Sequence, residues 1–364
     1  MSWQIAIRHR TVYKYAEPVR ASYNEARLTP PSVDGQHTLH AALVVTPAVR
    51  PLHYVDYWGT AVDAFDIHVP HIELAVLATS TVQTAPPRAV PAGISWSDLA
   101  APAVQDRFAE FLTASSFVIA EPELTELGRS LRAEPTPGQA GLRAAEWIHQ
   151  TLRYERGATH VRTSSAEARA AGKGVCQDFA HVTLALLRAV GLPARYVSGY
   201  LYPAAEAEVG ETMTGESHAW VEFWAGDWVA ADTTSLAEVG SRHVLLARGR
   251  DYADVRPLSG IYSGPAAEHF GVTVEVTRLG LAPREEIHSG SSCATTIIDS
   301  SSGAPKVVTM ATSEASRPHP IRIRPLRRRL LRGSNVHHRS PSQTSIHAAK
   351  SIGAGSGGTS MSGR

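Results

Sequence analysis

The stretch Gly172-Lys-Gly-Val-Cys-Gln-Asp-Phe179 marks the start of a helix that carries a cysteine in its first turn. Apolar residues continue at helical spacing to Val190, and Gly191-Leu-Pro193 supplies a capping glycine and a proline that end the helix. At such a helix start, the Cys176 sulfur faces free backbone N–H groups and the positive end of the helix dipole, which favour the thiolate. A thiolate is the nucleophile of covalent acyl transfer, although a free cysteine is also often just a small buried apolar residue.

The stretch His218-Ala-Trp-Val-Glu-Phe-Trp-Ala-Gly-Asp-Trp-Val-Ala-Ala-Asp232 predicts an antiparallel hairpin. A three- or five-residue loop centred on Ala225 places His218 directly opposite Asp232. The same register pairs Trp220 with Ala230 and Glu222 with Trp228. In this register the alternate residues face the core, and they are Ala219, Val221, Phe223, Val229 and Ala231. A two-residue loop would instead put Thr233 opposite His218 and separate the histidine from the carboxylate.

Together, the helix and the hairpin predict a catalytic group of Cys176, His218 and Asp232. An imidazole beside a thiolate serves as base and then as acid, and a carboxylate on its other nitrogen fixes the tautomer. Each residue also has an ordinary structural explanation, His218 as a sheet-surface histidine and Asp232 as a turn residue at a strand end. The combination on one helix and one hairpin favours the catalytic interpretation.

The rest of the first 280 residues predicts an α+β protein of two units. Short β-type runs with turn residues between them indicate an antiparallel β-sandwich, and helices followed by strands indicate an α+β core. The expected strands are 3–9, 40–46, 61–69, 74–83, 194–202, 218–224 and 228–233, and the expected helices are 141–154 and 176–190. The predicted domains are a β-rich domain 1–85, a linker 86–104, a catalytic core 105–280 and a tail 281–364.

The tail differs from the rest of the chain in charge and composition. It has 12 Lys and Arg against four acidic residues, giving +8 against −7 for residues 1–280, and it has no Phe, Trp or Tyr. A Ser/Gly-rich segment without aromatic residues buries too little to offset chain entropy, so we expect disorder. The basic patch 321–332 predicts weak contact with anionic lipid or nucleic acid, the alternative being a solvated tail without a partner. The abrupt change near Gly280 also resembles a shifted reading frame.

Composition excludes several other classes of protein. The sequence contains no run of 18 apolar residues, so it predicts no membrane-spanning helix. The first residues have no apolar signal region, and we therefore expect a cytoplasmic protein. Cys176 and Cys293 are the only cysteines, too few for a disulfide scaffold or a zinc ribbon. The 17 histidines have no metal-binding spacing and no glycine-rich phosphate loop is present, so we expect no metal and no cofactor.

Four motifs resemble the bacterial transglutaminase-like superfamily. They are Gly174-Val-Cys-Gln-Asp-Phe-Ala-His181, Pro193-Ala-Arg-Tyr-Val-Ser-Gly-Tyr200, Glu216-Ser-His-Ala-Trp-Val-Glu222 and Asp232-Thr-Thr234. Gly249-Arg-Asp-Tyr-Ala-Asp254 is similar to a later segment of that family. The N-terminal unit resembles the β-rich domain that precedes the core in such proteins. The resemblance runs from about residue 3 to about residue 279.

The resemblance implies a papain-like fold with Cys176 as nucleophile, His218 as acid and base, and Asp232 as the orienting residue. Asp232-Thr-Thr234 departs from the Asp-Pro-Thr that is common in the family, but the carboxylate is kept. For the oxyanion hole we expect the backbone N–H of Cys176, with a side chain of Gln177 or Trp220. Tyr200, Asp251 and Tyr252 are candidates for the substrate cleft, although packing would explain each equally well.

The expected activity is thiol-dependent acyl transfer from an amide of a protein or peptide, through a thioester. Water as acceptor makes the protein an amidase or protease, and a lysine makes it a crosslinking transglutaminase. The triad is common to both outcomes, and hydrolysis is slightly favoured for bacterial members of this superfamily. The alternative is a fold that has become an idle binding or scaffold module, against which the complete triad argues.

Overall fold

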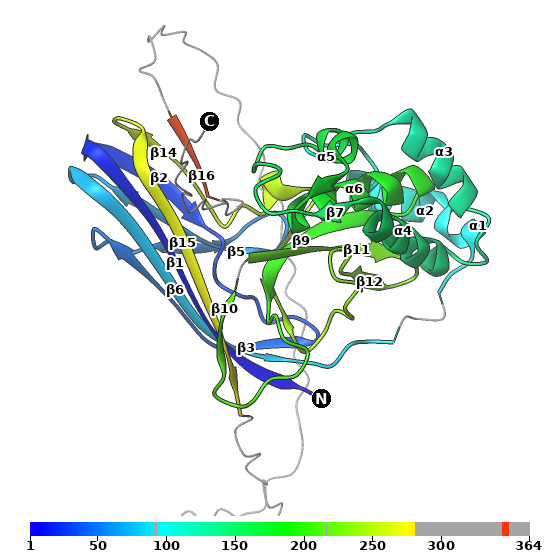
Figure 1. Ribbon diagram of the computed structural model, residues 1–364, viewed down its shortest axis with the longest axis horizontal. Coiled ribbons are helices and arrows are strands. Elements are labelled where there is room, and N and C mark those ends of the chain that lie inside the picture. Colours follow the sequence, from blue (N-terminus) through cyan, green and yellow to red (C-terminus); the bar gives the residue numbers. More distant parts are fainter. Residues whose placement is uncertain (90–92, 216, 281–343, 349–364) are drawn as a thin grey trace, which may run out of the picture. The chain divides into compact units, whose positions relative to one another are not determined.

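The computed structural model describes residues 1–89, 93–215, 217–280 and 344–348, and the structural statements below concern these residues. Two five-stranded antiparallel sheets contain the N-terminal strands (Figure 1). Their orders are β10-β15-β1-β6-β3 and β16-β14-β2-β5-β4. The strands are β1 Trp3–Val19, β2 Ala21–Ala26, β3 Gln36–Thr46, β4 Leu52–Val55, β5 Ala61–Ile67, β6 His71–Thr84, β10 Thr212–Gly215, β14 Leu258–Ser263, β15 Ala267–Leu279 and β16 Thr344–Ala348.

Alternation of apolar residues builds these sheets into a sandwich. Ile5 and Ile7 of β1 and Leu74 and Val76 of β6 are buried, as expected for residues spaced by two along a strand. Tyr15 of β1 packs against Tyr262 of β14 with ring centroids 5.3 Å apart, so side chains of the two sheets meet. The predicted N-terminal β-sandwich is confirmed.

The sandwich also takes in strands that follow the catalytic core in the sequence. β15 pairs along β1, and β14 pairs along β2, so each N-terminal strand gains a second neighbour from residues 258–279. An unpaired strand edge would leave a row of backbone N–H and C=O groups without partners, which explains the return of the chain. The predicted boundaries, 1–85 for the β-rich domain and 105–280 for the core, therefore separate strands that pair with each other in the structure.

The core has its own antiparallel sheet, of order β12-β11-β9-β13, with helices against it. Helix α6 packs on β9 and β11, and α3, α4 and α5 pack against α6. Phe223 of β11 and Phe179 of α6 are among its fully buried side chains. Its strands are β7 Arg153–Tyr154, β8 Lys173–Gly174, β9 Ala194–Leu201, β11 Ser217–Trp224, β12 Trp228–Ala231 and β13 His243–Gly249. Its helices are α1 Trp96–Leu99, α2 Pro102–Arg107, η1 Ala109–Phe111, α3 Pro122–Leu131, α4 Pro137–Thr151, α5 Ser165–Ala171, α6 Cys176–Val190 and η2 Tyr252–Asp254.

Helix α6 begins and ends where the sequence predicts. The Asp178 carboxylate accepts the Val175 backbone N–H at 2.8 Å and so caps the first turn. Gly191 has φ 91° and ends the helix in the left-handed conformation that favours glycine. The Leu192 N–H then donates to the Leu187 carbonyl oxygen at 2.9 Å, which satisfies one of the last free carbonyls.

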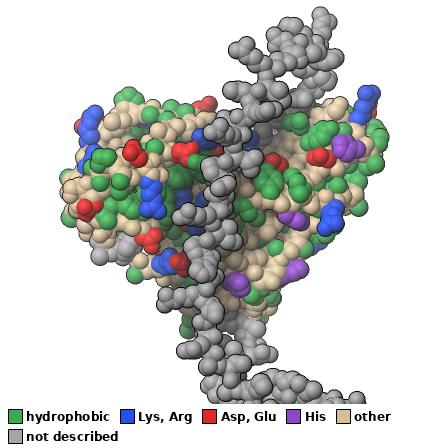
Figure 2. Space-filling view, turned by 180° about the vertical axis from the view of Figure 1, so that it is seen from behind, with side chains coloured by type: hydrophobic (Ala, Val, Ile, Leu, Met, Phe, Trp, Pro, Cys, Tyr) green, Lys and Arg blue, Asp and Glu red, His purple; other side chains and the backbone are tan. Residues whose placement is uncertain are grey.

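The predicted tail and linker are described only in part. The disorder expected for 281–364, and the basic patch 321–332, lie outside the described residues, apart from 344–348, which form β16 beside β14. The predicted linker 86–104 contains α1 and the start of α2. Within the described ranges, no helix is long and apolar enough to cross a membrane. On the face that Figure 2 displays, acidic and basic side chains are interspersed rather than gathered by sign.

Candidate active site

Cys176 is the first residue of α6 and is partly exposed. Its Sγ lies 4.0 Å from the carbonyl oxygen of Ser217, the residue before His218 on β11. The packing of α6 against β11 therefore brings the start of the helix to the start of the strand. This contact gives the thiol and the imidazole, 42 positions apart in the sequence, a common location.

His218 and Asp232 form the hydrogen-bonded pair that the sequence predicts. His218 Nε2 lies 2.8 Å from Asp232 Oδ2, and both side chains are largely buried. The other carboxylate oxygen, Oδ1, accepts the backbone N–H of Thr234 at 3.0 Å, and the Ser235 hydroxyl donates to Oδ2 at 2.7 Å. With Nε2 directed at Asp232, Nδ1 is the nitrogen left for Cys176.

The hairpin register differs from the predicted one by two residues. Glu222 pairs with Ala230, and Trp224 pairs with Trp228, whereas we expected Glu222 opposite Trp228 and His218 directly opposite Asp232. The loop is centred on Gly226, whose φ of 99° suits glycine alone, and not on Ala225. A shift of two keeps every side chain on its predicted face, so Asp232, just beyond the end of β12, still reaches His218 diagonally.

The two groups stabilise each other's charged forms. Burial alone would lower the pKa of His218, but hydrogen bonds with Asp232 and Cys176, and their negative charges, raise it to about 10. Burial alone would raise the pKa of Asp232, yet hydrogen bonds from His218, His243 and Ser235 hold it well below its usual range. At neutral pH this arrangement provides an imidazolium beside the Cys176 sulfur.

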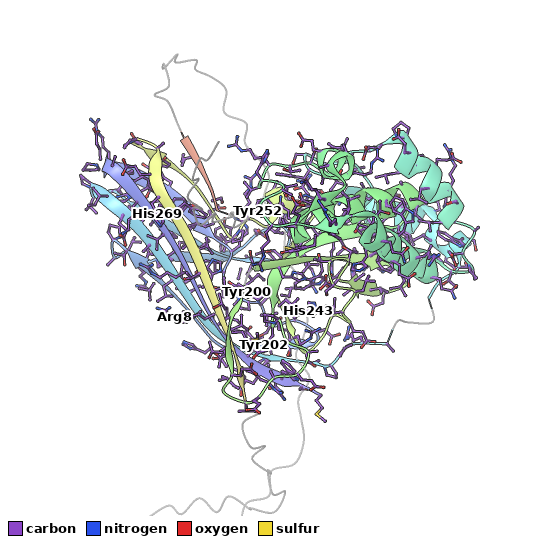
Figure 3. All side chains as sticks on the ribbon, in the orientation of Figure 1. Arg8, Tyr200, Tyr202, His243, Tyr252 and His269 are labelled. Carbon is purple, nitrogen blue, oxygen red and sulfur yellow. The ribbon has the colours of Figure 1, made fainter. Side chains whose placement is uncertain are left out.

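His243 is a part of the site that sequence reasoning missed. It is labelled in Figure 3, lies on β13 and is buried. Its Nε2 lies 3.4 Å from Asp232 Oδ2. Its Nδ1 accepts the Gly240 backbone N–H at 3.4 Å, so the proton on the ring belongs to Nε2 and is donated to Asp232. Nothing in the spacing of the 17 histidines singled this residue out, because its place depends on β13 pairing with β9.

Among the described residues, His218, Asp232 and His243 also form a group that could hold a metal ion. One ring nitrogen from each histidine and a carboxylate oxygen of Asp232 lie within 4.8 Å of one another. Two imidazoles and a carboxylate are donors that zinc accepts. The same atoms are already engaged in hydrogen bonds with one another, which is the arrangement that a histidine–carboxylate pair needs.

A cavity of about 100 Å³ lies beside Cys176. Some of the other candidate residues line this cavity and others do not. Gln177 and Tyr252 line it together with Cys176 and His218. Trp220, Tyr200 and Asp251 do not. Trp220 stacks near His218 with centroids 6.2 Å apart and lines a separate cavity of about 1000 Å³ that also reaches Asp232 and His243.

Tyr200 and Asp251 have structural partners instead. The Tyr200 hydroxyl lies 2.8 Å from Nδ1 of His9, a residue of β1. Figure 3 labels Tyr200 beside the long strands of the first sheet. Asp251 accepts the backbone N–H of Phe117 at 3.2 Å and that of Ala253 at 2.7 Å, and so caps η2. His9 itself lines the cavity beside Cys176 and was not predicted from the sequence.

Two family models match this chain. The profile described as "Transglutaminase-like superfamily" matches residues 125–233, a range that contains Cys176, His218 and Asp232. The profile described as "Bacterial transglutaminase-like N-terminal region" matches residues 5–83.

Relatives and a solved structure extend the similarity over most of the chain. An uncharacterized protein of Mycobacterium leprae is 43% identical over 277 residues, 76% of this chain and 99% of its own length. An uncharacterized protein of Mycobacterium bovis is 33% identical over 304 residues, 74% of this chain and 91% of its own. The fold is similar to "a Putative Cysteine Protease from Cytophaga hutchinsonii", with a TM-score of 0.60 and 23% identity over 78% of this chain and 92% of that one. The chain therefore belongs to the bacterial transglutaminase-like superfamily.

Proposed function

We propose that this protein is a cysteine enzyme that transfers the acyl group of a protein or peptide amide through a thioester on Cys176. The observation that carries the proposal is the 2.8 Å contact between His218 Nε2 and Asp232 Oδ2, which leaves the other imidazole nitrogen for the thiol. The start of α6 supports the same assignment, because a helix N-terminus stabilises a thiolate.

In the proposed reaction, Cys176 is the nucleophile and His218 donates or accepts the proton in each step. The Cys176 thiolate attacks the amide carbonyl carbon, and the carbonyl electrons move to oxygen. The tetrahedral intermediate collapses as the imidazolium of His218 gives its Nδ1 proton to the leaving nitrogen, releasing ammonia or an amine. Neutral His218 then takes a proton from water, the hydroxide attacks the thioester, and the acid leaves with the thiolate restored. Asp232 holds the ring in one orientation throughout.

Backbone groups at the start of α6 supply the best oxyanion donors. The N–H groups of the first helical residues, Cys176 and Gln177, have no intrahelical acceptors, and both residues line the cavity. The Gln177 side-chain amide donates one bond to the Val161 carbonyl oxygen at 3.2 Å, which fixes its position at the cavity wall. Trp220 is the weaker candidate, since it lines the other cavity.

Hydrolysis is the favoured outcome over transfer to a lysine. The cavity of about 100 Å³ must hold part of the acyl group, and the remaining room suits water better than a lysine side chain.

The test compares the full-length protein with Cys176→Ala on a glutamine-containing protein. Ammonia release without incorporation of a dansyl amine, lost in the variant, indicates hydrolysis; incorporation indicates transamidation. Iodoacetamide at pH 6 provides a second measurement that needs no substrate, with Cys293 as the internal reference, because an ordinary thiol is then largely protonated. Equal alkylation of both cysteines, with no activity dependent on Cys176, would favour the binding-module alternative.

A further inference from the structure

The cavity beside Cys176 is closed on one side by the N-terminal sheet. His9 pairs with Val274 and Thr11 pairs with Val272 across β1 and β15, and Gly215 of β10 pairs with Val274 from the other side. All five residues line the cavity. Residues two apart on a strand share a face, so they form one continuous patch over three strands, which we call the strand wall.

Hydrogen bonds connect the strand wall to the catalytic hairpin. The Nδ1 and Nε2 atoms of His9 lie 2.8 Å from the Tyr200 hydroxyl and 3.1 Å from the Thr11 hydroxyl, so both ring nitrogens are engaged. Tyr200 pairs with Ser217, whose carbonyl oxygen contacts Cys176 Sγ. The wall is thus held at a fixed place relative to the thiol.

The strand wall is uncharged. Val274 and Thr11 are buried, and burial lowers the pKa of His9 to about 4, so its imidazole is neutral at physiological pH. No carboxylate is found among the described residues that line the cavity, and its basic members outside the wall are Arg156, His160 and the catalytic His218. A charged group pressed against Val272 and Val274 would lose hydration without gaining a partner.

The strand wall also limits size. At Gly215 an added Cβ atom would lie 2.7 Å from a methyl carbon of Val276. The packing of Val276 therefore leaves no room for a side chain at this position of the wall. The cavity of about 100 Å³ is well below the roughly 300–1,000 Å³ of sites that hold drug-sized ligands. It suits one small side chain or a carboxamide.

We propose that the strand wall selects the acyl donor by admitting beside the reacting carbonyl only an uncharged group of a few non-hydrogen atoms. Valine-sized side chains and the carboxamide arm of glutamine meet this description, whereas glutamate and lysine do not. This proposal rests on the proposed thiol chemistry for its meaning, and it gives the N-terminal region a part in the active site.

The first test measures how charge on the wall changes access to Cys176. The full-length protein is treated with neutral, anionic and cationic methanethiosulfonate reagents, and the labelling rate of Cys176 is divided by that of glutathione. Val272→Glu is expected to slow the anionic reagent relative to the cationic one by at least fivefold, and Val272→Lys to do the reverse. The neutral reagent should change by less than twofold, which also reports an intact fold.

Val44, an exposed residue of β3 in the same sheet, provides the matched controls Val44→Glu and Val44→Lys, which should leave the rates unchanged. A charge ratio that does not respond at position 272 would overturn the proposal. A ratio that responds while Cys176 is alkylated no faster than Cys293 at pH 6 would place the wall at the thiol but reject the enzyme.

The second test uses fluorogenic peptide amides that differ only in the acyl residue, with Val, Gln, Glu or Lys. The wild type should have kcat/KM at least tenfold higher for Val or Gln than for Glu or Lys, and Val272→Lys should recover Glu. Equal kcat/KM for all four residues would overturn the selection by the wall, whatever the labelling rates.

Discussion

Gly199 lies directly opposite His218 in the pairing of β9 with β11, and the indole ring of Trp220 occupies the space where a side chain at position 199 would stand. A Cβ atom there would come within 2.6 Å of the Trp220 ring and would also collide with the Val244 carbonyl oxygen. Trp220 in turn stacks near His218, with ring planes 28° apart. The orientation of the imidazole therefore depends on a neighbour without a side chain.

Gly199→Ala should destabilise the protein and also reduce the reactivity of Cys176. Overpacking of this kind costs about 1–3 kcal/mol, and the displaced indole would move the His218 ring. Urea unfolding measures the first effect, and iodoacetamide labelling at pH 6 measures the second.

Gly271→Ala on β15 is the matched control, because its nearest neighbour is the far end of the His269 side chain at 3.3 Å. It should change neither quantity appreciably. Equal behaviour of the two variants would contradict the role assigned to Gly199.

Asp232→Asn should shift the alkaline side of the pH profile. Burial lowers the pKa of His218, and the hydrogen bond with Asp232 and its negative charge raise it. Without the carboxylate, the pKa of His218 therefore falls from about 10. The imidazolium that protonates the leaving group would then be lost at lower pH, so the alkaline limb of kcat/KM should move down by at least about one pH unit. The rate at the optimum should fall by about tenfold or more. A profile that keeps its alkaline limb would show that Asp232 does not control the histidine.

The stability of the wild type should fall between pH 6.5 and about pH 10. A histidine whose pKa is raised on folding, as His218 is to about 10, stabilises the fold below its ordinary pKa and loses that contribution as pH rises through the folded value. We expect a loss of about 1–3 kcal/mol over this window. The free energy of unfolding, measured in urea at several pH values, should depend less on pH in His218→Gln.

His243→Leu should be more destabilising than His243→Gln. Leucine leaves the Gly240 N–H without its acceptor and removes a donor from the buried Asp232 oxygen, at a cost of about 1–3 kcal/mol. Glutamine keeps a donor and an acceptor and should cost less. Thermal unfolding of the two variants compares them directly, and an equal loss would indicate that packing, and not hydrogen bonding, explains the position.

The features predicted correctly are those with local signals. Gly191 fixed the end of α6, and the side-chain alternation of the hairpin placed His218 and Asp232 on one face. The register was wrong by two because the position of positive φ, Gly226 instead of Ala225, decides where the hairpin turns. A shift of two residues leaves every side chain on the same face of its strand. For that reason the histidine–carboxylate pair was still predicted.

The features that were missed depend on contacts between distant segments. His9 meets Tyr200 at a sequence separation of 191, and no pattern in either strand announces that contact. The residues of strands β14 and β15 fall within the predicted core 105–280, whereas the partners of these strands are β2 and β1. Trp220, one of two side chains considered for the oxyanion hole, lines the other cavity.

The pairing of β1 with β15 has a consequence for biosynthesis. A ribosome adding about 5–20 residues per second needs on the order of tens of seconds to go from the first of these strands to the second. Until β15 emerges, the nascent chain has no Val272 or Val274 with which to close the cavity. Cys176 is already translated by then, so we expect the thiol to gain its substrate preference only late in synthesis. Stalled chains ending at residue 257, probed with neutral and charged methanethiosulfonates, should label Cys176 without the preference for the uncharged reagent that we expect the strand wall to give the finished protein.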